Sequence, residues 1–220
     1  MIKDKITRQL KNRFQQEIEK TVESGKERGF FICIERNKKE KLVPSKNTCE
    51  GDGCQVFVEN IKAGCPDEIQ GDFHTHPYLS ESKRTLKEEK MSIPSDGQLK
   101  NMIKDSITKL NKESGVTGIS PNAPSYTNLL NAFLSGSLER AKFDHTKGTT
   151  CVGDDLDRDK VECWTLKPET VNEDTLLKVA EEYLRIEEEG EGKGEYLRPW
   201  IIPLFDKEVI SLENDERNKY

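Results

Sequence analysis

The stretch GDFHTHP, residues 71–77, determines how we interpret this chain of 220 residues. It contains two of the three histidines in the sequence, and one residue separates them. On a β-strand, side chains two positions apart leave the same face of the sheet, so His74 and His76 can converge on one cation. Imidazole is the commonest metal ligand among protein side chains. Because Pro77 cannot donate to a sheet ladder, we expect the strand to end at this pair, at an open rim.

Length and composition predict one large domain, or one domain with an appendage. Apolar residues make up 33% of the sequence and charged residues 35%, which indicates a compact core beneath a heavily charged surface. No run approaches the roughly 18 apolar residues of a membrane span, and the first residues contain no apolar signal segment. We therefore expect a cytoplasmic protein. The net charge of −6 and the interleaving of basic with acidic residues argue against nucleic acid as a partner.

The spacing of apolar residues predicts an α+β fold, a mixed curved sheet with flanking helices. An apolar residue at every fourth position predicts a helix over residues 2–23. Short apolar runs predict strands at 29–34, 41–44, 54–58, 69–76, 149–152 and 161–166. Further helices are expected from residue 94, from residue 124 and over residues 171–188. We expect the first four strands to form a meander after the N-terminal helix.

Two segments have a less regular pattern. Residues 77–92 are polar and charged, and we expect a mobile excursion there. Residues 168–220 are expected to form a helical and extended appendage to a domain that spans residues 1–167. The appendage contains the apolar run 200–205, which we expect to be covered because exposed apolar surface is costly.

The six cysteines admit several interpretations, because cysteines inside cells are usually reduced, metal-bound or buried. Cys33 lies inside an apolar run and is expected to be a buried small hydrophobe. A structural zinc ion held by Cys49, Cys54 and Cys65 is one alternative. Disulfides are another, if the source is a hyperthermophile. The pairing cannot be read from the sequence.

Two histidines do not complete a catalytic zinc site, which has three protein ligands and one water molecule. A hydrolase also needs a general base beside that water molecule. Glu27 is a candidate base because it stands just before the apolar run 29–34, and the start of a neighbouring strand can lie at the same rim. Its simpler interpretation is one more charge at the end of a helix.

These residues resemble the JAMM/MPN+ (JAB domain) zinc metalloprotease family, in particular its prokaryotic and archaeal members. That family combines a Glu before the first strand, a His-x-His-Pro strand end and a Pro-Ser-x-x-Asp helix start, and the resemblance covers roughly residues 5–167. It implies the MPN fold and a zinc hydrolase of peptide or isopeptide bonds, with a protein substrate that often carries a ubiquitin-like modifier. In that scheme His74 and His76 hold zinc and Glu27 takes a proton from the zinc-bound water. The serine donates to the oxyanion.

The third zinc ligand departs from the family pattern, and two segments compete for its position. Residues 94–99, PSDGQL, place Gln98 where the family has Asp. Asp96 is nearby and is the only carboxylate among the candidates, although an Asp in a first helical turn is often only a cap or a charge favoured by the helix dipole. If Asp96 is the ligand, Ser95 or Ser92 is the oxyanion donor.

The second segment, PSYTNLL at residues 124–130, matches the flanking pattern better but places Asn128 at the ligand position. Ser125 is then the oxyanion donor, and residues 78–123 form an insertion over the site, either a lid or a surface elaboration. A neutral amide oxygen binds zinc more weakly than a carboxylate does. A site with no intact third ligand is the remaining alternative.

The sequence therefore predicts a zinc-dependent peptidase or isopeptidase. The alternative is an MPN-type scaffold that has lost the metal and serves as a protein-interaction module, which the Asn or Gln at the ligand position favours. Scaffold members of the family usually lose the histidines too, so His74, His76 and Glu27 favour catalysis. A metalloenzyme for a non-protein amide or a small thiocarboxylate precursor is a further possibility.

Overall fold

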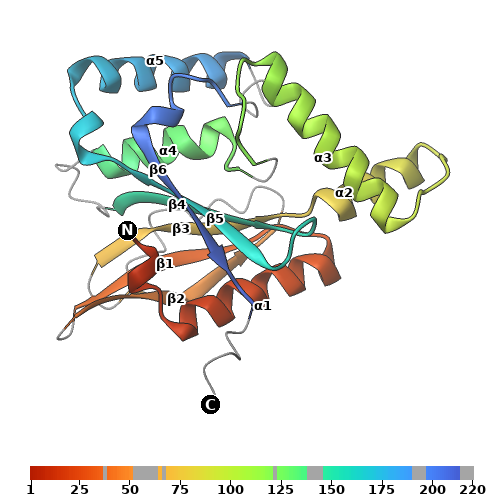
Figure 1. Cartoon of the computed structure of the whole chain (residues 1–220), viewed down its shortest axis with the longest axis horizontal. Coiled ribbons are helices and arrows are strands. Elements are labelled where there is room, and N and C mark those ends of the chain that lie inside the picture. Colours follow the sequence, from red (N-terminus) through yellow and green to blue (C-terminus); the bar gives the residue numbers. More distant parts are fainter. Residues whose placement is uncertain are drawn as a thin grey trace.

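The computed structural model describes residues 1–36, 39–51, 64–65, 68–120, 123–137, 146–189 and 197–213. Within these residues, six strands form one mixed sheet in the order β2-β1-β3-β4-β5-β6 (Figure 1). The β3–β4 pair is parallel, and the other neighbouring pairs are antiparallel. The strands are β1 Arg28–Arg36, β2 Glu40–Glu50, β3 Glu68–His76, β4 Thr146–Asp154, β5 Lys160–Leu166 and β6 Phe205–Ser211.

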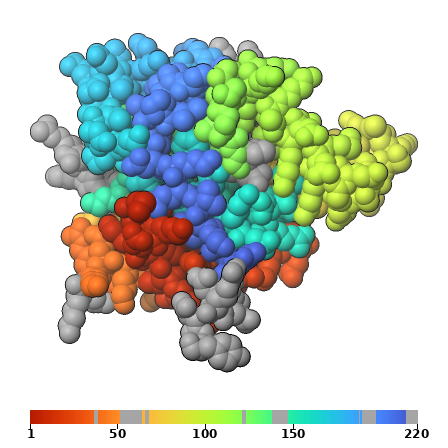
Figure 2. Space-filling model, in the orientation of Figure 1, coloured from red at the N-terminus to blue at the C-terminus, as the bar shows by residue number. Residues whose placement is uncertain are grey.

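Helices cover both faces of this sheet, so the fold is α+β as the sequence predicts (Figure 1). On one face α1 packs against β1, β2, β3 and β4, and on the other α4 packs against β4 and β5 and also contacts α5. In both views the α2–α3 pair protrudes from one end of the body (Figures 1 and 2). The helices are α1 Arg8–Ser24, α2 Tyr78–Glu88, α3 Asp96–Glu113, α4 Tyr126–Ser137 and α5 Glu173–Glu189, with short 3-10 turns η1 Lys3–Lys5, η3 Pro168–Thr170 and η4 Ile202–Leu204.

The N-terminal helix has defined ends and one buried face. The Thr7 hydroxyl accepts from the Leu10 amide at 3.2 Å and caps the first turn, and Gly25 ends the helix with a left-handed φ of 65°. Phe14 lies in the core, with its ring centroid 5.8 Å from that of Phe30 and 4.7 Å from that of Phe73. The α1 face of the sheet is therefore closed by an aromatic cluster to which residues 71–77 contribute Phe73.

The sheet is curved, because the N-terminal segment reaches both of its edge strands. The Ile2 amide donates to the Glu208 carboxylate on β6 at 2.7 Å, and the Thr7 amide donates to the Leu42 carbonyl on β2 at 3.2 Å. Leu42 of β2 and Ile210 of β6 also lie in one core cluster. The two edges therefore approach each other.

The expected meander of the first four strands is wrong. The strand β3 pairs with β1 and not with β2. The reason is that β1 is buried on both faces, as Phe30, Phe31 and Cys33 show, so it needs a neighbouring strand on each side. The strand expected at residues 54–58 lies outside the described residues.

The mobile excursion expected at residues 77–92 is also wrong, because α2 occupies most of it. Leu79 of α2 is buried in a cluster with Leu99 of α3 and Leu156, and Leu86 packs against that cluster. The helix is therefore stabilised by its partner α3, and a local apolar pattern of so few residues does not reveal it.

The described residues of the expected appendage, 168–189 and 197–213, belong to the same sheet and core, so they do not form an appendage. The strand β6 pairs with β5 from Lys160↔Ser211 to Leu166↔Phe205, and Ile210 lies in the same core cluster as Phe14. The apolar run 200–205 is covered as expected, since Ile201 is fully buried in a cluster with residues of α4.

The described cysteines are oxidised, and none of them is free. Disulfides join Cys33 to Cys65 and Cys151 to Cys163, and Cys49 is disulfide-bonded as well. Cys33 is buried as expected, but it is disulfide-bonded to Cys65 and so is not the unbonded small hydrophobe that the sequence predicted. A zinc site built from Cys49, Cys54 and Cys65 is excluded because the Cys65 sulfur is bonded to Cys33; Cys54 itself lies outside the described residues. Among the helices described, none has the length and apolarity needed to cross a membrane.

Candidate metal centre

The two histidines lie side by side at the end of β3, as the alternation of a strand predicts. We call this end of the sheet, with His74 and His76, the rim. Their ring centroids are 5.1 Å apart, and only 7% of His74 is exposed. The strand ends at His76, and Pro77 is the N-cap residue of α2. The prediction that Pro77 ends the strand at the histidine pair is confirmed.

Glu27 reaches the same rim from the start of β1. In the antiparallel β1–β3 pair, Gly29 lies opposite His74, and the same register continued by two residues sets Glu27 across from His76. Residues directly opposite each other in such a pair share a face of the sheet. Consistent with this, the negative charge of Glu27 is one of the factors that raise the pKa of His74.

The start of α4 brings Asn128 and Ser125 to His74. The Asn128 Oδ1 atom lies 3.2 Å from His74 Nε2. The same oxygen accepts from the Ser125 amide at 2.9 Å and from the Ser125 hydroxyl at 2.7 Å. In return, the Asn128 amide donates to Ser125 Oγ at 3.2 Å. These reciprocal bonds form a capping box, which fixes the Asn128 side chain relative to the helix.

The start of α3 is a second capping box, and it lies apart from the histidines. The Ser95 amide donates to Gln98 Oε1 at 3.2 Å. The side chain of Asp96 is 61% exposed and forms an ion pair with Lys83 of α2 at 2.7 Å. Of the two Pro-Ser segments, the structure therefore brings Ser125 and Asn128 to the histidines. It does not bring Ser95 and Asp96 there.

Two residues that were not predicted from the sequence contact the histidine rings. Asp72 Oδ2 lies 3.0 Å from His74 Nδ1, and the Tyr78 hydroxyl lies 2.7 Å from His76 Nδ1. The same alternation that paired the histidines also places Asp72, two residues earlier, on their face. Tyr78 was not predictable in this way, because its position depends on the unexpected helix α2.

Asp155 was also missed, and it fixes the start of α2 beside His76. Its carboxylate accepts from the Leu79 amide at 2.9 Å, from the Ser80 amide at 3.1 Å and from the Ser80 hydroxyl at 3.2 Å. Its own amide donates to the His76 carbonyl at 3.3 Å. A carboxylate at a helix N-terminus is favoured by the unpaired amides and by the helix dipole.

The two histidines differ in their affinity for a proton. Burial opposes the charged form of His74, but the hydrogen bond to Asp72 and the charges of Asp72 and Glu27 outweigh it, so the pKa of His74 is raised. Burial, together with the neighbouring His74, lowers the pKa of His76 to about 3. His76 is therefore neutral at any ordinary pH, which is the form of imidazole that binds metals.

The geometry of the rim fits a divalent cation, but its donor atoms are weak. Two ligand atoms of a tetrahedral zinc ion are roughly 3.3 Å apart, given Zn–N and Zn–O bonds of about 2.0–2.2 Å, and His74 Nε2 and Asn128 Oδ1 are 3.2 Å apart. However, the described residues contain no group of three or more His, Cys, Asp or Glu side chains that could hold a metal. The candidate ligands are two imidazoles and one amide oxygen, all of them neutral.

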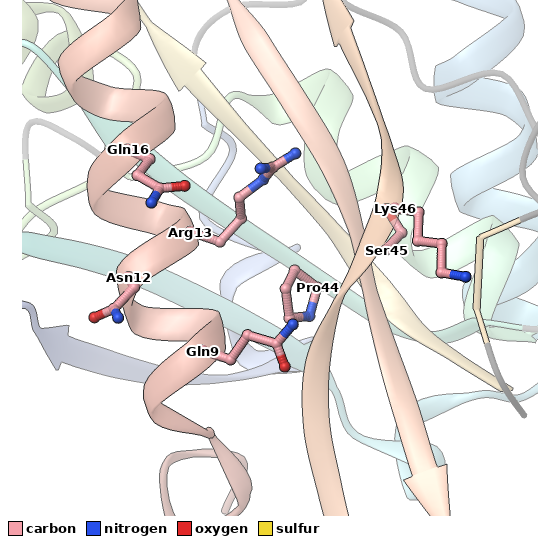
Figure 3. A pocket seen from close by; sticks show the side chains of 7 residues that line it. All are labelled: Gln9, Asn12, Arg13, Gln16, Pro44, Ser45 and Lys46. Atoms are coloured by element: carbon pink, nitrogen blue, oxygen red, sulfur yellow. The ribbon is translucent and has the colours of Figure 1, made fainter.

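A cavity of about 410 Å³ lies between α1 and β2 (Figure 3). None of the candidate site residues lines it, so it has no part in the candidate metal centre. Its lining residues are Gln9, Asn12, Arg13, Gln16, Pro44, Ser45 and Lys46. Comparison of the whole chain with protein-family models, with curated proteins and with solved structures gives no significant match.

Proposed function

We propose that this chain is a zinc-dependent peptidase or isopeptidase of the JAMM/MPN+ type, with the MPN fold. The observation that carries the proposal is the 3.2 Å separation between Asn128 Oδ1 and His74 Nε2. The segment that resembles the family's ligand helix more closely, PSYTN, is also the one that meets the histidines in space. Sequence pattern and tertiary contact thus both support Asn128 as the proposed third ligand.

In this proposal His74, His76 and Asn128 hold the zinc ion. Bound zinc would polarise the scissile carbonyl and lower the pKa of a water molecule. Glu27, at the same rim, accepts a proton from that water and delivers it to the leaving amine. The Ser125 hydroxyl, which donates to Asn128 in this structure, turns to the oxyanion as charge develops there.

The proposed substrate is a protein, either one that carries a ubiquitin-like modifier or one with a processed tail. The α2–α3 pair protrudes from the body (Figure 1), and α2 begins two residues after His76, at the end of β3. Asp155 holds the first turn of α2 in place, so the start of the α2–α3 pair is fixed beside the rim. We propose that it borders the path of the substrate.

Zinc binding and hydrolysis test the proposal together. Equilibrium dialysis should give one zinc ion per chain for the wild type and for Asp96→Ala, and weaker binding for Asn128→Ala. Asp96→Ala is the matched control because it removes the rival candidate. A quenched fluorescent isopeptide should be cleaved by the wild type, whereas Glu27→Gln should retain zinc and lose cleavage. Loss of zinc in Asp96→Ala, with normal binding by Asn128→Ala, would contradict the assignment.

The alternative function is a metal-free MPN-type scaffold, and one observation favours it. His74 Nε2 already has a hydrogen-bond partner in Asn128 Oδ1, and that partner is neutral. This ring nitrogen therefore has a partner without a metal ion. A wild type that takes up no zinc from an excess in dialysis would favour the scaffold and reject the hydrolase.

A further inference from the structure

The rim has no anionic residue among its candidate ligands, but a carboxylate lies directly behind one of them. Asp72 Oδ2 is 3.0 Å from His74 Nδ1, on the side of the ring opposite to Asn128. We propose that Asp72, acting through the His74 imidazole, supplies the negative charge that the neutral Asn128 does not supply at the third ligand position. This inference rests on the proposed function.

The carboxylate of Asp72 is fixed from two directions. It shares a strand face with His74, two residues away, and its 31% exposed side chain contacts a His74 ring that is only 9% exposed. From β4, the Thr150 hydroxyl donates to the same Oδ2 atom at 3.3 Å. Thr150 lies beside Asp72 in the β3–β4 register and is buried. A carboxylate held in this way is a positioning group and not a mobile surface charge.

A carboxylate behind a ligand histidine has a definite chemical effect. It accepts a hydrogen bond from Nδ1–H, which fixes the tautomer with the Nε2 lone pair directed at the metal, and it makes the imidazole a stronger donor. Three neutral ligands would themselves contribute no negative charge to a bound zinc ion. Because Asp72 is joined to one of those ligands by a hydrogen bond, its charge acts on the metal although it is not itself a ligand.

The test is a double-mutant cycle on zinc affinity, measured by competition with a chromogenic chelator at fixed pH and ionic strength. Asp72→Asn keeps the shape of the side chain and removes its charge, and we expect it to weaken zinc binding by about 10–100-fold. Asn128→Asp should tighten binding. In the double variant the carboxylate is moved from behind His74 to the ligand position, so affinity should return to the wild-type value or exceed it.

The same cycle separates this role from a merely structural one. If the carboxylate introduced by Asn128→Asp supplies the missing charge, Asp72→Asn weakens zinc binding by a smaller factor in the Asn128→Asp variant than in the wild type. Glu68→Gln is the matched control, because it removes one carboxylate at the other end of β3, and it should bind zinc within about twofold of the wild type. The inference would be overturned if Asp72→Asn weakened zinc binding by the same factor in the wild type and in Asn128→Asp, or if Asp72→Asn bound zinc as tightly as the wild type does.

Failure of this inference can be distinguished from failure of the proposed function. If the wild type does not bind zinc, the hydrolase proposal and this inference fall together. If it binds zinc and Asp72→Asn binds equally well, only the role of Asp72 is rejected. Thermal melts of the zinc-free proteins check folding, and if Asp72→Asn does not fold, Thr150→Val removes the hydroxyl that fixes Asp72. We expect Thr150→Val to weaken zinc binding by several-fold, and unchanged affinity would again overturn the inference.

Discussion

The substitution Gly71→Ala tests how tightly β3 is packed against β4, three residues before His74. A Cβ atom at Gly71 would lie 2.6 Å from the carbonyl carbon of Thr149 and closer still to its oxygen, whereas real Cβ atoms essentially never come within 3.0 Å of such neighbours. The obstacle is backbone, so no side-chain rotation relieves it. The two strands would have to separate at the point where their register already shifts, between Ile69 and Gly71.

The expected cost follows from what that separation breaks. Overpacking in a core costs about 1–3 kcal/mol, and a buried backbone group that loses its hydrogen bond costs about another 1–3 kcal/mol. We therefore expect Gly71→Ala to lower the free energy of unfolding by about 2–6 kcal/mol, a large part of the roughly 5–15 kcal/mol available to a typical domain.

Urea unfolding followed by tryptophan fluorescence measures this change, because Trp164 is buried on β5. Gly97→Ala is the matched control: a Cβ atom there meets nothing within 4 Å in the first turn of α3. Alanine is the better helix former, so the control should be unchanged or more stable by up to about 1 kcal/mol. A loss below about 1 kcal/mol in Gly71→Ala would refute the packing argument, since that is no more than an average substitution costs.

Three further predictions concern the elements that hold the rim. Asp155→Ala removes the acceptor of the first α2 amides and should lower the free energy of unfolding by about 1–3 kcal/mol in urea titrations; unchanged stability would contradict its capping role. Replacing Cys33 and Cys65 by serine opens a loop closed across 32 positions and should cost about 3–4 kcal/mol in urea titrations without reductant, which leave the Cys151–Cys163 bond intact; unchanged stability would contradict a stabilising role for the Cys33–Cys65 bond. Burial raises the pKa of Asp154 to about 7, so between its unfolded pKa and pH 7 the folded chain holds a proton that the unfolded chain releases, and stability falls as pH rises. Asp154→Asn should therefore stabilise the chelator-treated protein more at pH 8 than at pH 4; an equal effect at both would be contrary to this reasoning.

The sequence predicted most elements and the histidine pair, but it could not choose between the two Pro-Ser segments. Both turn out to be capping boxes, so the local pattern reports a helix start in each case. Only the tertiary position of α4 distinguishes them, because it brings Asn128 to His74 while Asp96 pairs with Lys83. Alternation along β3, in contrast, is a local property, and it would have identified Asp72 as readily as it identified the histidines.

The errors concern contacts between distant parts of the chain. The helix α2 depends on Leu99 of α3 for burial of Leu79, and nothing within residues 77–92 encodes that partner. Six cysteines allow 15 complete pairings, so the bond between Cys33 and Cys65 is likewise not determined by spacing. The order of β1, β2 and β3 was partly readable, however, because an apolar run on both faces of β1 already indicates an interior strand.

The neutral side chain of Asn128 determines what competes with a metal ion at this rim. In the structure both ring nitrogens of His74 face oxygen atoms, those of Asp72 and Asn128. Without a metal ion, a doubly protonated His74 ring can therefore donate a hydrogen bond to each of these two oxygens. Under the proposed function, a cation held by His74 Nε2 would take the place of one of those protons, and Asn128 Oδ1 would serve as a metal ligand in place of a proton acceptor; the 3.2 Å separation suits both roles. A carboxylate in its place would attract a doubly charged zinc ion more strongly than a proton. Asn128 therefore shifts the balance towards the proton, and zinc should exchange from this site more readily than from one with an anionic third ligand.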